Sequence, residues 1–318
     1  MTPEQQEKLR SLPAVSELTG REPVADDPQA VDTRTERHGT RFDLLVLVDH
    51  EHEASIEVGA DGAVSAPLAG VPEAYRDGQA GLLDVALSPQ FGSDHLVYLA
   101  YAEPSLRGNL CGTAVARARL EDDALVDLRV VYRQEPKLSA GTHVGTRLVF
   151  DDDGLLWVTQ GDNRQAKHVQ DLAKLQCKLV RIRPDGSIPG DNPFVGRDDA
   201  RPEIWSTGHR NMQGAALHPV TRRLWTHEHG PMGGDEINLP EAGKNYGWPL
   251  VTHGVDYSGQ PVPGAVGREA PGMEPPHYVW EKSPGVSGMA FYAGDRMPGW
   301  NGNLFIGDST GANDLMGF

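Results

Sequence analysis

The pattern that governs the architecture of this chain is clearest in Arg147-Leu148-Val149-Phe150-Asp151-Asp152-Asp153-Gly154, with Leu156-Trp157-Val158-Thr159 directly after it. An apolar run, a turn rich in Asp and Gly, and a second apolar run predict two antiparallel strands joined by a short turn. Three further segments repeat this pattern: Asp84-Val85-Ala86-Leu87-Ser88-Pro89 with Val97-Tyr98-Leu99, Gly214-Ala215-Ala216-Leu217-His218-Pro219 with Leu224-Trp225-Thr226, and Ser287-Gly288-Met289-Ala290-Phe291-Tyr292 with Asn303-Leu304-Phe305-Ile306-Gly307. The copies start roughly 60–75 residues apart, which is longer than common propeller blades but consistent with four strands plus long connecting loops.

This repeat predicts the fold class. A four-stranded sheet cannot bury both of its faces alone, and radial stacking gives each face a neighbour. We therefore predict an all-β protein, a β-propeller of four-stranded antiparallel sheets, over residues 41–318. Its first hairpin is expected at 43–48 and 54–58. Residues 1–40 are polar, charged and aperiodic, which indicates a poorly ordered N-terminal arm.

Composition excludes several classes of function. The 318 residues include 37 Gly and 24 Pro and carry a net charge of -16, which argues against nucleic acid as a partner because phosphate would be repelled. No apolar run approaches the ~20 residues that a membrane-spanning helix needs. The start, Met1-Thr2-Pro3-Glu4, shows no secretory signal. Cys111 and Cys177 are too far apart for a metal-ligand spacing, so we expect buried or free thiols.

A loop rich in oxygen donors stands out as a candidate ligand site. It is Glu228-His229-Gly230-Pro231-Met232-Gly233-Gly234-Asp235-Glu236-Ile237-Asn238, followed by Asn245-Tyr246-Gly247-Trp248-Pro249. Backbone carbonyls, carboxylates and a tyrosine oxygen suit calcium, which takes 6–8 oxygen ligands at flexible geometry. The pattern fits no standard calcium loop, and a tight turn with solvated acids explains it equally well.

In a propeller, loops from different blades converge at one end of the central channel, so residues distant in sequence meet there. The loops next to the repeated strands carry acids, bases, a cation and amides, as an active site requires. These candidates are Gln79, His143, Asp162, His209, Arg210, Asn211 and the loop 228–238.

Six segments, in order from about residue 65 to 308, resemble the soluble glucose/sorbosone dehydrogenase family. They are Gly78-Gln79-Ala80-Gly81-Leu82-Leu83-Asp84, His143-Val144-Gly145-Thr146-Arg147-Leu148, Leu175-Gln176-Cys177-Lys178-Leu179-Val180-Arg181-Ile182, Gly208-His209-Arg210-Asn211-Met212-Gln213-Gly214, the loop 228–238 and the segment 245–249. The resemblance implies a six-bladed β-propeller that uses pyrroloquinoline quinone (PQQ) to oxidise aldose sugars at the anomeric carbon to lactones. It also implies an electron acceptor (a dye, a quinone or a redox protein) and a periplasmic or secreted location.

The same resemblance implies roles for single residues. His143 resembles the general base that takes the proton of the anomeric hydroxyl, and Asp162 resembles the carboxylate that orients it. Arg210 resembles the cation beside the quinone oxygens, and Gln79 and Asn211 resemble amide contacts to the cofactor. From the residues alone, a structural turn histidine also explains His143, and a turn explains Asp162 and its neighbours equally well.

The resemblance further implies two calcium ions. One would bridge cofactor and protein through the backbone oxygens of Gly230 and Pro231, and a second, structural ion would use Asp235, Glu236 and Tyr246. A dication would offset the carboxylates of the cofactor and polarise its quinone.

The chain departs from the family pattern at Val144, Cys177 and Thr207, and it stops at Phe318, soon after Leu304-Phe305-Ile306-Gly307-Asp308. The sequence therefore leaves open whether the last blade is complete. We expect weakened PQQ binding and an unpaired strand edge near 304–307, which would favour a homo-oligomer. Two alternatives remain: a calcium-dependent propeller hydrolase of the lactonase kind, and a non-catalytic propeller that is truncated or engineered.

Overall fold

The computed structural model describes residues 44–49, 54–59, 66–139, 141–294, 296–308 and 316–317. In these ranges the chain forms five sheets, and neighbouring strands within each sheet pair antiparallel. The predicted arm at 1–40 lies outside the described residues. No helix in the described part of the chain is long and apolar enough to cross a membrane.

Three of the sheets have four strands in the order of the chain or its reverse. The first contains β3 (Leu82–Leu87), β4 (Leu96–Pro104), β5 (Cys111–Glu121) and β6 (Ala124–Arg133). The second contains β7 (Leu148–Phe150), β8 (Leu156–Val158), β9 (Leu179–Ile182) and β10 (Ile204–Ser206). The third contains β11 (Met212–Leu217), β12 (Leu224–Glu228), β13 (Asp235–Asn238) and β14 (Tyr278–Trp280).

Two smaller sheets complete the described fold. One pairs β1 (Leu44–Asp49) with β2 (Ala54–Gly59), and the other joins β15 (Val286–Phe291), β16 (Leu304–Asp308) and β17 (Met316–Gly317). The helices are single turns: α3 (Phe91–Asp94), η1 (Ala166–His168) and η2 (Pro298–Trp300). Strand β16 pairs with β15 on one side and, at Phe305 and Ile306, with β17 on the other. The expectation of an unpaired edge at 304–307 is therefore wrong for these two residues.

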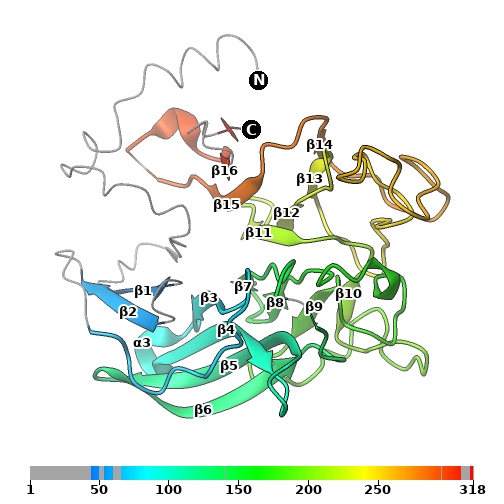
Figure 1. Ribbon diagram of the computed structural model, residues 1–318. Coiled ribbons are helices and arrows are strands. Elements are labelled where there is room, and N and C mark those ends of the chain that lie inside the picture. Colours follow the sequence, from blue (N-terminus) through cyan, green and yellow to red (C-terminus); the bar gives the residue numbers. More distant parts are fainter. Residues whose placement is uncertain are drawn as a thin grey trace.

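The first strands of successive sheets lie side by side. Strand β1 contacts β3, β3 contacts β7, β7 contacts β11, and β11 contacts β15. In Figure 1 these strands surround the middle of the molecule, and the later strands of each sheet lie farther out. All four predicted repeat hairpins are present, as β3–β4, β7–β8, β11–β12 and β15–β16, and so is the predicted first hairpin, β1–β2. This arrangement is typical of a β-propeller.

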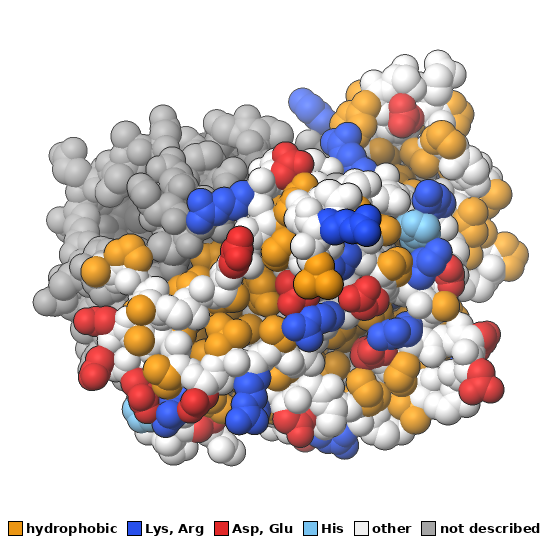
Figure 2. Space-filling view, turned by 60° about the horizontal axis from the view of Figure 1, so that its bottom comes forward, with side chains coloured by type: hydrophobic (Ala, Val, Ile, Leu, Met, Phe, Trp, Pro, Cys, Tyr) orange, Lys and Arg blue, Asp and Glu red, His pale blue; other side chains and the backbone are white. Residues whose placement is uncertain are grey.

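Apolar cores lie between successive sheets, as radial stacking requires. One core joins Tyr98 and Val115 of the first four-stranded sheet to Val158 and Val180 of the second. Smaller cores join the second sheet to the third through Leu179 and Met212, and the third to the last through Ile237 and Ile306. The second and third four-stranded sheets therefore have an apolar core on each face, which a four-stranded sheet standing alone would not have. On the outside, acidic and basic side chains are interspersed over the face shown in Figure 2.

Candidate active site

The loops that precede β3, β7, β11 and β15 meet in one pocket, as the repeat predicted. Its volume is about 620 Å³, within the range of small-molecule sites. Side chains and backbone from far-apart segments line it: Gln79, His143, Arg164, Arg210, Asn211, His229, Gly230, Pro231, Met232, Gly233, Asp235, Tyr257, Glu281, Lys282, Ser283 and Gly285.

His143 and Asp162 form a buried pair at this pocket. The His143 Nδ1 atom lies 2.7 Å from Asp162 Oδ1, and the side chains are almost completely enclosed. Because an ionised carboxylate can only accept, Nδ1 donates and Nε2 keeps its lone pair. The structure therefore joins the two residues that the sequence predicted as base and orienting acid.

The charges around this pair favour a neutral imidazole and an ionised carboxylate. Burial lowers the pKa of His143, Asp162 offsets part of that effect, and the charges of Arg210 and Arg164 lower the pKa further. Burial alone would raise the pKa of Asp162, but the hydrogen bond from His143 and the charge of Arg210 outweigh it and lower the pKa. A neutral histidine with a free Nε2 can accept a proton.

Close backbone approach brings the His143 loop against the Arg210 loop. His143 adopts a left-handed conformation with φ 50°, and its amide donates to Gln79 Oε1 at 2.8 Å. A Cβ at Gly161 would collide with the His143 carbonyl, and a Cβ at Gly145 would come within 2.6 Å of Asn211 Oδ1. Only glycine at these two positions allows the loops to approach this closely.

Arg210 is held at the pocket by contacts to both its backbone and its side chain. Its amide donates to Glu228 Oε2, and its carbonyl accepts from the Asp162 amide at 2.9 Å and from the Cys177 thiol at 2.8 Å. The guanidinium donates through Nη1 to the His229 carbonyl at 2.9 Å. Its Nε atom is buried with no hydrogen-bond partner among the described residues, and so is Asn211 Oδ1. Unpartnered buried polar atoms at a pocket mark places where a ligand can bind.

Glu228 supports this arrangement from behind the pocket. Its Oε1 atom accepts from His209 Nδ1 and from Asn238 Nδ2, each at 3.0 Å. His209 Nε2 in turn lies 2.9 Å from Ser206 Oγ. These side chains are buried, and neither Glu228 nor His209 lines the pocket, so they support the Arg210 backbone from behind it.

Several side chains at the site carried no role in the sequence analysis, and three of them add charge or hydrogen bonds to it. Arg164 and Lys282 line the pocket and add positive charge to it. Trp248 donates from Nε1 to Asp162 Oδ2 at 2.9 Å, and its ring lies 5.2 Å from the Arg210 guanidinium carbon. The segment 245–249 stood out as part of the family resemblance, but no sequence pattern indicated that its tryptophan reaches across to Asp162.

The oxygen-rich loop lies partly at the pocket. Gly230 and Pro231 line it, and calcium at their backbone oxygens stays a prediction. Asp235, however, already accepts three hydrogen bonds from the protein: Oδ1 accepts from the Gly230 amide, and Oδ2 accepts from the amides of Gly285 and Val286. These contacts and His229 outweigh the effect of burial and lower the pKa of Asp235 to about 2.

The other two predicted metal ligands also have partners within the protein. Glu236 shares Asn238 Nδ2 with Glu228, and burial together with the Glu228 charge raises the pKa of Glu236 to about 8. The Tyr246 hydroxyl donates to the Leu239 carbonyl at 2.9 Å and accepts from the Glu241 amide at 3.1 Å. Among the described residues, no group of three or more His, Cys, Asp or Glu side chains is arranged to hold a metal ion.

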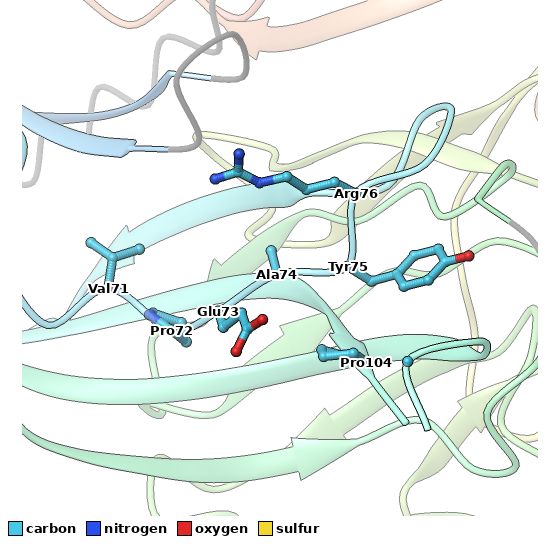
Figure 3. A pocket seen from close by; sticks show the side chains of 8 residues that line it. Val71, Pro72, Glu73, Ala74, Tyr75, Arg76 and Pro104 are labelled. Carbon is cyan, nitrogen blue, oxygen red and sulfur yellow. The ribbon is translucent and has the colours of Figure 1, made fainter. Parts of the chain in front are cut away.

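A second pocket, of about 480 Å³, shares no lining residue with the first. It lies along the segment before β3 and the end of β4, and Figure 3 shows Glu73 and Arg76 as its charged side chains. The base, the cation and the amides all belong to the first pocket, so we assign the candidate active site there.

Fold and site together define a propeller-like protein with a histidine–aspartate pair beside a fixed arginine. Residues 43–313 match the family Glucose / Sorbosone dehydrogenase, and the chain belongs to this family. It is 46% identical over 301 residues to aldose sugar dehydrogenase YliI of Escherichia coli (strain K12), a match that covers 94% of this chain and 79% of that protein.

Solved structures of sugar dehydrogenases also resemble this chain. A glucose dehydrogenase superposes with a TM-score of 0.82 at 45% identity, covering 88% of this chain and 83% of the other. The PQQ-bound aldose sugar dehydrogenase of Streptomyces coelicolor superposes with a TM-score of 0.69 at 26% identity, covering 91% and 85%. The resemblance noted in the sequence is confirmed.

Proposed function

We propose that this protein is a PQQ-dependent aldose sugar dehydrogenase. The observation that carries the proposal is the buried His143–Asp162 pair beside Arg210 and Asn211, with His143, Arg210 and Asn211 lining one pocket. The family relationship and the PQQ-bound relative support it.

The donors at the pocket fit an acidic quinone cofactor. Arg164 and Lys282 supply positive charge for its carboxylates and Arg210 for its quinone oxygens, whereas Glu281 and Asp235, which already accepts hydrogen bonds from backbone amides, are the acids. The unpartnered Arg210 Nε and Asn211 Oδ1 offer one donor and one acceptor to a bound molecule. Gln79 lines the same pocket, and its Oε1 atom accepts from the His143 amide, so its NH₂ group is left to donate to a ligand.

The protein's own part in the reaction is to take up a proton. His143 Nε2 accepts the proton of the sugar's anomeric hydroxyl while Asp162 holds the ring through Nδ1 and stabilises the imidazolium. Arg210 supplies fixed positive charge where negative charge develops on the cofactor oxygens. When bound, PQQ supplies the quinone that takes the hydride from the anomeric carbon.

We propose calcium at the backbone oxygens of Gly230 and Pro231, beside the cofactor. Backbone carbonyls are ordinary calcium ligands, and both residues line the pocket. The second ion, on Asp235, Glu236 and Tyr246, stays a prediction, because these oxygens make hydrogen bonds within the protein that the ion would have to replace.

Further parts of the proposal follow from the family. The fold is a six-bladed propeller, the electron acceptor is a dye, a quinone or a redox protein, and the protein works in the periplasm or outside the cell. The homo-oligomer stays a prediction, whose basis is reduced to the part of the 304–307 edge that β17 does not pair.

The test is reconstitution of the purified protein with PQQ and calcium, followed by dye reduction with glucose and other aldoses. Matched samples lack PQQ, contain a chelator, or carry His143→Gln. We expect sugar-dependent dye reduction that needs PQQ and is lost in the variant. Lactone hydrolysis without dye reduction would instead identify a hydrolase, and PQQ binding without turnover of any sugar would identify a non-catalytic protein; either result overturns the proposal.

A further inference from the structure

Trp248 contacts both the carboxylate of Asp162 and the guanidinium of Arg210. Its indole N–H donates to Asp162 Oδ2 at 2.9 Å, while Asp162 Oδ1 accepts from His143 Nδ1 at 2.7 Å and from the Arg164 amide at 2.8 Å. These three donors approach the carboxylate from both of its oxygens, so they fix its rotation. With that rotation fixed, Oδ1 stays directed at the imidazole.

The face of the same indole lies against Arg210. The guanidinium carbon is 5.2 Å from the ring centroid, within the range of a cation–π contact. The guanidinium also donates a hydrogen bond to the His229 carbonyl. The ring therefore limits where the rest of the Arg210 side chain can lie.

The backbone fixes Trp248 in turn. Its amide donates to the Gly208 carbonyl at 2.8 Å, and its carbonyl accepts from Gln170 Nε2 at 2.7 Å. Two residues earlier, the Tyr246 amide donates to the Thr207 carbonyl at 2.8 Å. The loop containing Trp248 thus runs beside residues 207–208, immediately before His209 and Arg210.

We propose that Trp248 is a positioning residue of this site, whose indole N–H orients the Asp162 carboxylate and whose ring holds the Arg210 guanidinium. One side chain thereby sets the geometry of both the base and the cation. The proposal rests on the proposed function for what those two groups do, but the contacts themselves belong to the protein without cofactor.

Loss of the indole N–H has a defined electrostatic consequence. Without that donor the negative charge of Asp162 is less stabilised, so it attracts the imidazolium of His143 more strongly and raises its proton affinity. The charged groups that face His143 are Asp162, Arg210 and Arg164, and the buried Cys177 thiol lies near Asp162. Replacement of tryptophan by phenylalanine changes none of these charges.

Two variants separate the two contacts. Trp248→Phe keeps an aromatic ring beside Arg210 and removes the N–H, whereas Trp248→Leu removes both. Trp205→Phe is the matched control, because Trp205 also lies against an arginine, Arg181 at 4.2 Å, and its N–H donates to the Pro240 carbonyl. Circular dichroism and thermal melting establish that each variant is folded.

The readouts are the His143 titration in the cofactor-free protein, followed by NMR of the labelled imidazole and assigned with His143→Gln, and the Kd for PQQ. We expect Trp248→Phe to raise the proton affinity of His143 roughly threefold or more and to lower kcat more than it changes KM. Trp248→Leu should in addition weaken PQQ binding roughly 3–30-fold, the range of a cation–π contact. Trp205→Phe should change neither.

An unchanged His143 titration in both Trp248 variants would overturn the inference, whatever their activity. A shifted titration in a protein that PQQ does not activate would uphold the inference and refute the proposed function.

Discussion

Replacement of Asp162 by Asn is the sharpest test of the catalytic pair, because the structure defines what each orientation of the amide would lose. If the carbonyl oxygen faces His143 and Arg164, the amide NH₂ faces the indole N–H of Trp248, and two donors oppose each other at 2.9 Å. If the carbonyl faces Trp248, the NH₂ faces His143 Nδ1, which must then accept. In that tautomer Nε2 of His143 carries the proton, so Nε2 can no longer act as the base.

Either orientation also removes the negative charge that stabilises the imidazolium. We expect kcat to fall by ~10²–10⁴, which corresponds to about 2.7–5.4 kcal/mol of transition-state stabilisation. The assay is steady-state dye reduction by the PQQ-loaded variant across pH, with the Kd for PQQ measured separately. PQQ binding should change little, because Asp162 does not line the pocket.

Asp151→Asn is the matched control. Asp151 Oδ2 likewise accepts an indole N–H, from Trp157 at 2.9 Å, and Oδ1 accepts backbone amides, but the residue lies outside the pocket. This variant should lose stability and keep its kcat. If Asp162→Asn retained both its kcat and the low-pH limb of its rate profile, the assignment of Asp162 as the partner of the base would be refuted.

Three further predictions concern the base, the metal and a buried lysine. His143→Gln should lower the rate per bound PQQ by ~10²–10⁴ with the Kd for PQQ changed only a few-fold, and loss of binding with an unchanged rate would place His143 in a different role. Calcium should raise the melting temperature, since a ligand at a hundredfold excess over its Kd stabilises the folded state by ~2.7 kcal/mol; equal melting in chelator and in millimolar calcium would contradict a metal at Gly230 and Pro231. Burial lowers the pKa of Lys178 from 10.5 to about 8, so between these pH values the unfolded chain binds more protons than the folded protein. The free energy of unfolding of the wild type, relative to that of Lys178→Met, should therefore rise by up to ~3 kcal/mol from pH 8 to 10.5. A difference that does not change with pH would contradict an ionisable buried amine.

The strands that the sequence predicted are those whose patterns are local. Apolar runs around an Asp-Gly or Pro turn, such as 148–158, need no tertiary information to be recognised. The outer strands β5 and β6 escaped attention, because alternating residues such as Arg117 and Arg119 with Ala and Leu resemble a solvated segment until a partner sheet covers one face. Local patterns thus found the inner hairpins but not the full width of the first sheet.

The site followed the same division. His143, Asp162 and Arg210 were predicted because each stands in or near a segment with a recognisable sequence pattern, and the structure brings the three residues together. The contact between Trp248 and Asp162 spans 86 residues and depends on the loop at 245–249 running beside Gly208, which no local pattern encodes. Two of the hydrogen bonds that Asp235 accepts likewise come from Gly285 and Val286, some 50 residues away.

The Asp162 and Arg210 backbones are hydrogen-bonded to each other and the two side chains share a partner, so the effects of substitutions at this site should not be independent. The Asp162 amide donates to the Arg210 carbonyl, Trp248 contacts both side chains, and Glu228 holds the Arg210 amide. A change at any of these positions therefore displaces groups that a second change also affects. Residues that share partners in this way show coupling energies of about 0.5–3 kcal/mol, whereas independent sites add. The double variant Asp162→Asn, Trp248→Phe should therefore lose less kcat than the sum of the two single changes predicts. In Asp162→Asn the amide NH₂ can face the indole N–H of Trp248, and removing that N–H then relieves a clash instead of breaking a hydrogen bond. Strict additivity of the two effects on kcat would show that Trp248 acts on the site by a route other than the Asp162 carboxylate.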